Sequence, residues 1–265
     1  MSRFGKIELS DPRFEPQHLR FLTFNSPALG GRGDVALFVP PNSEQMTNLP
    51  LVVLLHGVYC SHWAWALKAG AHLTAAKLIE SDDIPPLVLV MPSDGLWAEG
   101  SGYVPHESAN YEAWIVEDVI DCVREILPQL GVETFIAGLS MGGYGALRLG
   151  AKYPDRFQGI SAHSSATNLD SLNEIITRHP IPYQFDETDD PFILYWMKKH
   201  RAQLPPIRFD CGHDDRLLAH NRQLHQQLLQ NDISHQYEEF PGDHKWPYWE
   251  EHLKDTLRFF GEIAK

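Results

Sequence analysis

The pentapeptide Gly138-Leu-Ser-Met-Gly142 has the residue types and spacing of a serine nucleophile on a sharp turn. A short apolar run, 134–137, precedes it, and a helical pattern that begins at Met141 follows it. A glycine-rich turn can contain these residues by chance, but a strand before and a helix after favour a reactive hydroxyl. We therefore predict that Ser140 is a nucleophile and that the backbone N–H of Met141 faces the oxyanion formed on attack.

A serine hydroxyl is a weak nucleophile without a base, and the base needs an acid to orient it. Where this type of turn carries the serine, the chain order is serine, acid, histidine. His244 lies downstream of Ser140, in a loop between an expected last strand, 235–240, and a helix. Asp214 and Asp215 share an earlier turn. We predict that His244 is the base. Position alone does not distinguish Asp214 from Asp215 as the acid.

The second donor to an oxyanion is expected in the loop after another buried strand. The apolar run Leu51–Leu55 leads into His56-Gly-Val-Tyr-Cys60. Val58 is the candidate donor through its backbone N–H, whereas His56 is expected to hold the loop rather than to act as a base. Cys60 has two interpretations, a small buried apolar residue or a reactive thiol at the rim of the site.

Three further residues are candidates for lining a substrate pocket. His163 ends the expected strand after the serine turn, and Trp97 follows another strand end. Trp196 lies in 167–204, a long aromatic and proline-bearing stretch that breaks the rhythm of strands and helices. We expect this stretch to be a cap or lid inserted over one end of the sheet. The histidine and cysteine spacing matches no zinc signature, and no phosphate-binding glycine loop occurs, so no metal and no cofactor are expected.

Short apolar runs alternate with longer helical patterns along the chain, and continuous apolar runs suit a parallel sheet buried on both faces. The expected strands are 21–24, 35–39, 51–55, 87–91, 134–137, 158–161, 207–210 and 235–240, and the expected helices are 63–80, 111–127, 141–152, 217–230 and 246–263. The first two strands should form an antiparallel hairpin around Gly30–Gly33. The alternation predicts an α/β fold with a mostly parallel, doubly wound sheet, whose functional groups gather at the carboxyl ends of the strands.

The length of 265 residues fits a single domain, 1–265. The formal charge of −13 disfavours nucleic acid and anionic membranes as partners, because both need clustered positive charge. The first 17 residues contain no apolar stretch of the secretory type. Three widely spaced cysteines fit a reducing compartment. We expect a cytoplasmic protein that acts on a small-molecule ester, and a homodimer is one possible assembly.

Together these residues resemble the esterase D branch of the α/β-hydrolases, which includes S-formylglutathione hydrolases, tributyrin esterase-like enzymes, feruloyl esterases and mycolyltransferases. The stretch from Gly138 to Phe157 looks like the serine turn and following helix of that family. Cys211-Gly-His-Asp-Asp215 resembles its Gly-x-x-Asp acid loop, which favours Asp215 over Asp214. Gly242-Asp-His244 is similar to its histidine loop.

The resemblance implies an α/β-hydrolase fold and a serine carboxylesterase that works without a cofactor through Ser140, Asp215 and His244. Short acyl groups are expected from the same analogy. S-formylglutathione hydrolysis or acyl transfer is an alternative, because Cys60 falls where S-formylglutathione hydrolases carry a cysteine. The loop 56–59 departs from those enzymes, which have a serine and a small polar residue there. An inactive protein that only binds is a second alternative, which the complete set of triad residues disfavours.

Overall fold

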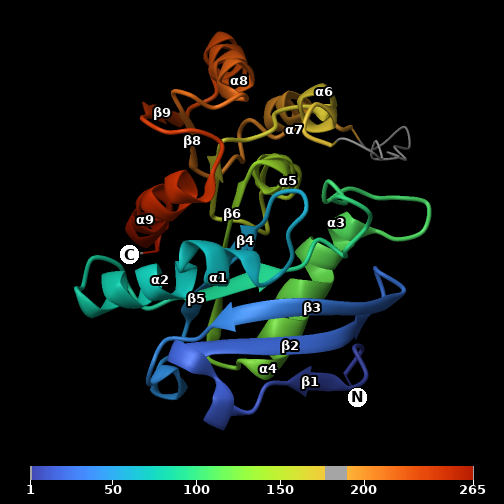
Figure 1. The fold of residues 1–265 in the computed structure, drawn as a ribbon, viewed down its shortest axis with the longest axis vertical. Helices are drawn as coiled ribbons and strands as arrows, with labels where there is room; N and C mark the ends of the chain where they lie inside the picture. Colours follow the sequence, from blue (N-terminus) through green and yellow to red (C-terminus); the bar gives the residue numbers. More distant parts are fainter. Residues whose placement is uncertain (1, 177–189, 265) are drawn as a thin grey trace.

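The computed structural model of the chain describes residues 2–176 and 190–264. Its strands are β1 (Ile7–Leu9), β2 (Leu19–Ser26), β3 (Gly31–Phe38), β4 (Leu49–Leu55), β5 (Val88–Pro92), β6 (Leu130–Leu139), β7 (Gly159–His163), β8 (Ile207–Gly212) and β9 (Gln236–Phe240). They form one sheet in the order β1-β2-β3-β5-β4-β6-β7-β8-β9 (Figure 1). The pairs from β5 through β9 are parallel, and the pairs among β1, β2, β3 and β5 are antiparallel. The predicted mostly parallel sheet with antiparallel N-terminal strands is confirmed.

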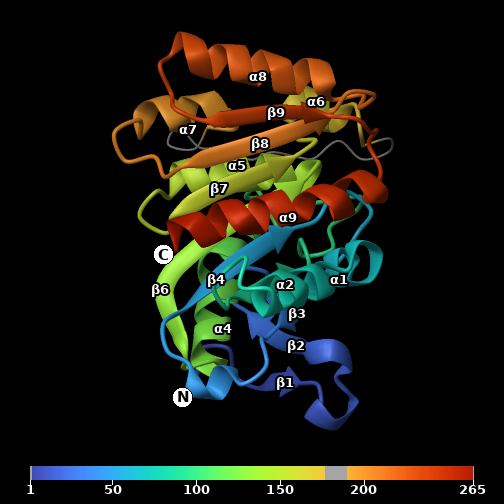
Figure 2. The same cartoon turned by 90° about the vertical axis from the view of Figure 1, so that its left-hand side faces the viewer.

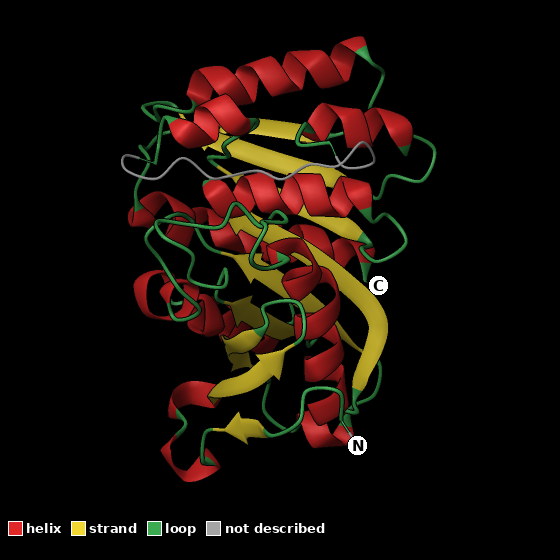
Figure 3. Cartoon of the chain, turned by 90° about the vertical axis from the view of Figure 1, so that its right-hand side faces the viewer, coloured by secondary structure: helices red, strands yellow, loops and turns green. Residues whose placement is uncertain are grey.

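Helices cover both faces of this sheet. They are α1 (Ala64–Ala69), α2 (Ala71–Glu80), α3 (Tyr111–Ala113), a π-helical segment (Trp114–Val119), α4 (Ile120–Ile126), α5 (Met141–Lys152), α6 (Leu169–Asn173), α7 (Ile193–Lys199), α8 (Leu218–Gln230) and α9 (Trp246–Ile263), with short 3-10 turns at Pro12–Phe14, Pro16–His18 and Ser43–Gln45. Helices α1, α2 and α9 lie on one face (Figure 2), and α4, α5, α7 and α8 lie on the other (Figure 3). The sheet is therefore doubly wound.

Strand β4 shows why continuous apolar runs become central strands. All seven of its residues are buried. Val52 and Leu54 pack into the core beneath α1, α2 and α9, whereas Leu51, Val53 and Leu55 pack into the core on the opposite face. A strand with apolar contacts on both faces cannot alternate with polar residues, so its sequence is uniformly apolar.

Several boundaries differ from the expected ones. The single helix expected over 63–80 is two helices, because Gly70 has a left-handed backbone (φ 58°) that ends α1 and redirects the chain into α2. Of the three glycines expected in the hairpin turn, Gly30 lies in the turn with φ 60°, whereas Gly31 and Gly33 pair with β2 as the start of β3. Strand β1 was not expected, since three residues are too short for a periodic signal.

A buried ion-pair cluster joins α3 to α5. The side chain of Arg148 has no exposed surface, and its guanidinium pairs with the carboxylate of Glu112. Lys152 Nζ lies 2.7 Å from the same carboxylate, and the Tyr153 hydroxyl donates to it. Burial acts to raise the pKa of Glu112, but the charges of Arg148 and Lys152 outweigh burial and lower the pKa. This cluster fixes the far end of α5 away from Ser140.

In the part of the chain that the structure describes, no helix combines the length and apolar character needed to cross a lipid bilayer.

Candidate active site

Ser140 lies on the turn between β6 and α5. Its backbone has φ 55° and ψ −117°, outside the regions that L-residues usually adopt. A side chain on Gly138 would overlap the backbone of Gly142, and one on Gly142 would overlap the carbonyl of Leu55. The turn can be this tight only because both flanking residues are glycines. It places the serine at the carboxyl end of β6, where the sequence predicted it.

Ser140, His244 and Asp215 form one line of hydrogen bonds. Ser140 Oγ lies 3.0 Å from His244 Nε2. His244 Nδ1 lies 2.8 Å from Asp215 Oδ2 and 3.0 Å from Oδ1. Nδ1 therefore carries the proton that it donates to the carboxylate, which leaves Nε2 free to accept the serine proton. These are the three residues predicted for the triad, brought together from the loops after β6, β8 and β9.

The two adjacent carboxylates have different surroundings. Asp215 is buried and also accepts a hydrogen bond from the backbone N–H of Leu217, whereas Asp214 is exposed. Burial acts to raise the pKa of Asp215, but the bonds and charge of His244 and the Leu217 N–H outweigh it and lower the pKa. A carboxylate that stays ionised can orient and stabilise a charged imidazole, so the geometry favours Asp215 as the acid.

The loop after β4 runs beside the serine. A Cβ on Gly57 would lie 3.3 Å from Ser140 Cβ, so the backbone of this loop passes within contact distance of the nucleophile. Within the described residues, no carbonyl accepts a hydrogen bond from the backbone N–H of Val58 or of Met141. Met141 opens α5, where the first N–H groups have no partner inside the helix. Both groups are available to an oxyanion, and that role remains a prediction.

His56 holds this loop in place. The ring is buried; Nδ1 donates to the carbonyl of Gly57 (2.7 Å), and Nε2 accepts the backbone N–H of Asp94 (3.1 Å). Burial lowers the pKa of His56, which favours the neutral ring that this pattern of bonds requires. Both nitrogens are engaged with backbone groups, so His56 does not act as a base, in agreement with the structural role expected for it.

A second loop, which follows β5, supports the predicted oxyanion side and was not predicted from the sequence. The carboxylate of Asp94 accepts the N–H groups of Leu96 (3.0 Å) and Ser101 (2.7 Å) and so shapes the loop after β5. The hydroxyl of Tyr103 donates to the carbonyl of His56 (3.0 Å). A polar turn directly after a strand, Ser93-Asp94-Gly95, was the available signal.

The predicted pocket residues separate into two groups. Trp97 lies in the loop after β5, three residues before Gly100, whose backbone packs against the side chains of Met141 and Val58, and its place in a pocket remains a prediction. His163 and Trp196 are buried, so their contact with a substrate remains a prediction. His163 points toward α9 with no exposed surface, and Trp196 is buried, with its ring N–H bonded to the carbonyl of Asp190.

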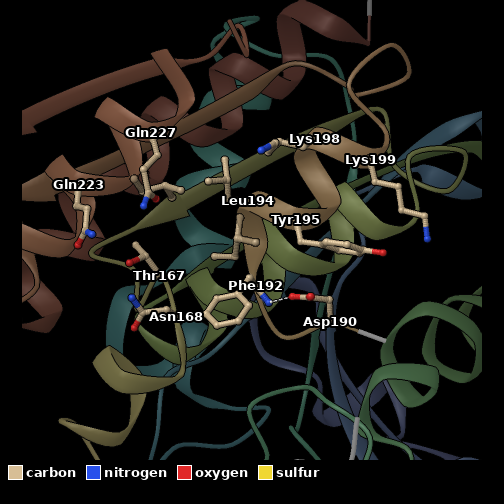
Figure 4. Close-up of a pocket in the computed structure, with 12 residues that line it drawn as sticks. Thr167, Asn168, Asp190, Phe192, Leu194, Tyr195, Lys198, Lys199, Gln223 and Gln227 are labelled. Carbon is tan, nitrogen blue, oxygen red and sulfur yellow. Dashed lines mark hydrogen bonds between the residues drawn. The ribbon is translucent and has the colours of Figure 1, made fainter. Parts of the chain in front are cut away.

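The predicted insertion is described only in part, because 177–189 lie outside the described residues. Its helix α7 packs against α5 and beside α8, and a cavity of about 760 Å³ opens between α7 and α8 (Figure 4). The cavity is lined by Thr167, Asn168, Asp190, Phe192, Ile193, Leu194, Tyr195, Lys198, Lys199, Gln223, Leu224 and Gln227. None of the predicted site residues is among them. A cap over Ser140 therefore remains a prediction.

Cys60 is partly exposed, two residues beyond Val58. Burial raises the pKa of its thiol, and the nearby charge of Lys68 only partly opposes that effect. The thiol is therefore a weak nucleophile near neutral pH. Among the described residues, no group of three or more histidine, cysteine, aspartate or glutamate side chains is arranged to hold a metal ion.

A serine on a strained strand-to-helix turn, hydrogen-bonded through a histidine to an aspartate from later loops of a doubly wound sheet, is the arrangement typical of serine hydrolases of the α/β-hydrolase class. The chain matches the family model "Putative esterase" over residues 26–260 and belongs to that esterase family. It is thus an enzyme that acts on ester bonds, and the resemblance to the esterase D branch is confirmed.

Two relatives illustrate the range of the family. An acetyl esterase of Caldicellulosiruptor saccharolyticus is 28% identical over 237 residues, which are 82% of this chain and 85% of the relative. An S-formylglutathione hydrolase of Arabidopsis thaliana is 27% identical over 181 residues, 63% of this chain and 62% of the relative.

Solved structures share the fold over nearly the whole chain. A ferulic acid esterase superposes with a TM-score of 0.79 at 23% identity, covering 99% of this chain and 100% of its own. The Staphylococcus aureus fluorophosphonate-binding serine hydrolase FphF has a TM-score of 0.80 at 21% identity, covering 93% of this chain and 98% of its own. At these identities the likeness establishes the α/β-hydrolase fold alone.

The two carboxylates of the acid loop can be told apart by substitution. Asp215→Asn should lower kcat by about 10⁴-fold, because an amide cannot hold His244 in the required tautomer. Asp214→Asn, at the exposed neighbouring position, should change kcat by less than about twofold. Steady-state hydrolysis of p-nitrophenyl acetate measures both. Loss of activity in Asp214→Asn alone would move the acid by one residue.

The raised pKa of Cys60 predicts how alkylation depends on pH. N-ethylmaleimide should inhibit slowly at pH 7, and the inhibition rate should rise about tenfold per pH unit toward pH 9 as the thiolate forms. Inhibition is expected because the reagent crowds the Val58 loop. Cys60→Ser should keep its activity and resist the reagent, since Cys122 and Cys211 are buried. Equal inhibition of both proteins, or of neither, would contradict a place for Cys60 beside the site.

Proposed function

We propose that this esterase cleaves short-chain carboxylic esters through a covalent acyl-enzyme on Ser140. The observation that carries the proposal is the continuous line of hydrogen bonds from Ser140 Oγ through His244 to Asp215. In such an arrangement a hydroxyl transfers its proton to the imidazole while its oxygen attacks the ester carbonyl.

Each triad residue has one role in the proposed reaction. His244 takes the proton of Ser140 at Nε2 and passes it to the departing alcohol, which leaves the acyl group on Ser140. A water molecule then gives its proton to His244 and attacks the acyl-enzyme, and the same proton returns to Ser140 as the acid is released. Asp215 keeps His244 oriented and stabilises its charged form without taking the proton.

The oxyanion that forms in both steps needs donors that are already in place. We assign this role to the backbone N–H groups of Met141 and Val58. What supports it is that neither N–H has a carbonyl partner among the described residues and that Gly57 passes beside Ser140. The ring of His56 links the carbonyl of Gly57 to the backbone N–H of Asp94 and so supports the loop that carries Val58.

The acyl preference is inferred from the relatives. The match to an acetyl esterase covers most of both chains and supports a small acyl group. S-formylglutathione hydrolysis is the second candidate, supported by the shorter match to the plant enzyme. A glutathione site must bind two carboxylates, and the formal charge of −13 opposes that chemistry. Carboxylic esters are therefore the favoured substrates.

A cytoplasmic location belongs to the same proposal. All three cysteines are free thiols, and two of them, Cys122 and Cys211, are buried. Free thiols of this kind are usual in reducing compartments.

Replacement of the nucleophile tests the proposal directly. Ser140→Ala should lower kcat for p-nitrophenyl acetate on the order of a million-fold, because the remaining groups have no nucleophile to activate. Circular dichroism and thermal unfolding should show a folded variant. A folded Ser140→Ala protein with the activity of the parent would overturn the proposed mechanism.

The substrate class is tested by a panel of esters at one pH. We expect kcat/KM to be highest for acetate and butyrate esters of p-nitrophenol and to fall for acyl chains of about ten carbons or more, for which a small acyl pocket has no room. S-formylglutathione should be hydrolysed more slowly than the short esters. Faster turnover of the thioester would replace the carboxylesterase assignment with the second candidate.

A further inference from the structure

A second carboxylate–imidazole pair lies beneath the triad. Asp210, on β8, is fully buried, and both of its carboxylate oxygens lie within 3.0 Å of His163 Nδ1. Oδ2 also lies 2.5 Å from Arg208 Nη1, and Oδ1 accepts the hydroxyl of Tyr248 at 2.8 Å. We call these four residues the Asp210 network. It joins β7, β8 and α9, on the face of the sheet that α9 covers (Figure 2).

Two of the three partners of Asp210, His163 and Tyr248, touch a segment that carries a triad residue. The backbone carbonyl of His163 accepts the N–H of Ser140 at 3.0 Å. The ring of Tyr248 lies against Gly242 so closely that a Cβ on that glycine would be 2.7 Å from it. Gly242 is two residues before His244. The network therefore connects the strand behind the nucleophile to the loop of the base.

The loop of the acid is joined to the same unit. The carbonyl of Gly242 accepts the backbone N–H of Asp214 at 2.9 Å, and the backbone of Gly212 packs directly against Gly242. Asp210 precedes Asp215 by five residues and lies in β8, two residues before the strand ends at Gly212. All three triad loops thus rest on a common buried support.

The network is complete in its hydrogen bonds. The other ring nitrogen of His163 lies 2.9 Å from Thr256 Oγ1, which lies 2.6 Å from Ser161 Oγ. Burial acts to raise the pKa of Asp210, but His163 and Arg208, with the Tyr248 hydroxyl, lower it to about 2. A charged, fully bonded and buried carboxylate has one low-energy arrangement, so its partners are held at fixed positions.

We propose that Asp210 is a positioning residue, which acts through His163 and Tyr248 to set the distance and orientation between Ser140 and His244. The inference rests on the proposed function, because it concerns the same nucleophile and base. Asp210 touches neither substrate nor the reacting atoms. Its effect on the rate comes from alignment, and a misplacement of about 1 Å at a catalytic group can cost roughly 100-fold in rate.

Tyr248→Phe tests this role with little disturbance, since it removes one hydroxyl and keeps the ring against Gly242. Tyr153→Phe is the matched control. It removes a hydroxyl that also donates to a largely buried carboxylate paired with an arginine, Glu112, but at the end of α5 remote from Ser140. Both variants lose a hydrogen bond to a charged carboxylate, so the thermal unfolding temperature of each should fall.

The two variants should differ in catalysis. We expect Tyr248→Phe to lower kcat by about 10- to 100-fold while KM changes by less than about twofold, because alignment matters in the transition state rather than in substrate binding. The second-order rate of inactivation by a fluorophosphonate probe, which reports attack by Ser140 alone, should fall by a similar factor. Tyr153→Phe should keep both parent rates.

Asp210→Asn is a second variant, in which the shape is kept and the charge is lost. It should lower kcat more than Tyr248→Phe does. If Asp210→Asn fails to fold, the comparison of Tyr248→Phe with Tyr153→Phe tests the positioning role. Parent kcat and inactivation rate in Tyr248→Phe, with a lowered unfolding temperature, would overturn the inference and leave only a structural role. Ser140→Ala is assayed alongside: if it is active, the proposed function fails as well, and if it is inactive, only the positioning role is in question.

Discussion

The left-handed backbone of Ser140 is the constraint on which the rest of the site depends. A non-glycine residue in this conformation costs on the order of 1–3 kcal/mol, so the surrounding structure must hold it there. The N–H of Ser140 donates to the carbonyl of His163, and its own carbonyl accepts the N–H groups of Tyr144 and Ala166. These bonds come from β7, from the segment after it and from α5. The sheet and the helix together therefore hold the Ser140 hydroxyl within hydrogen-bond distance of His244. The strain is offset by the fold as a whole and not by the turn itself.

Two buried aspartates, each bonded to the Nδ1 of a histidine, show how surroundings decide what one chemical pair does. In the pair of Asp215 and His244, the far ring nitrogen faces the nucleophile, and the histidine side chain is 14% exposed. In the pair of Asp210 and His163, the other ring nitrogen, Nε2 of His163, is hydrogen-bonded to the hydroxyl of Thr256, and neither side chain of the pair has exposed surface. In the first pair, a ring nitrogen that can accept a proton faces the hydroxyl of Ser140. The second has every atom engaged, so it can support neighbouring loops but cannot exchange protons with a ligand.

The alternation of strands and helices and the serine turn were predictable, because apolar periodicity and flanking glycines are local signals. What the sequence could not supply was the face on which each strand residue lies. Gly159, Ser161 and His163 share one face of β7 by the two-residue period, but only the packed structure shows that α9 covers this face and that the ring of His163 is bonded beneath it. Likewise, Asp215 could be preferred to Asp214 only by resemblance, since their difference in burial arises from tertiary contacts.

The bond between Thr256 and His163 joins residues that are 93 positions apart in the sequence, and this separation affects the order in which the site can form during synthesis. Contacts between residues so distant in sequence form late in folding, after local helices and hairpins. During synthesis Ser140 leaves the ribosome long before the histidine loop and α9, so the nascent chain carries a nucleophile with no base beside it. The line of hydrogen bonds from Ser140 through His244 to Asp215 therefore cannot form before the chain through His244 has been synthesised, and the buried support behind it is incomplete until α9 packs on the sheet.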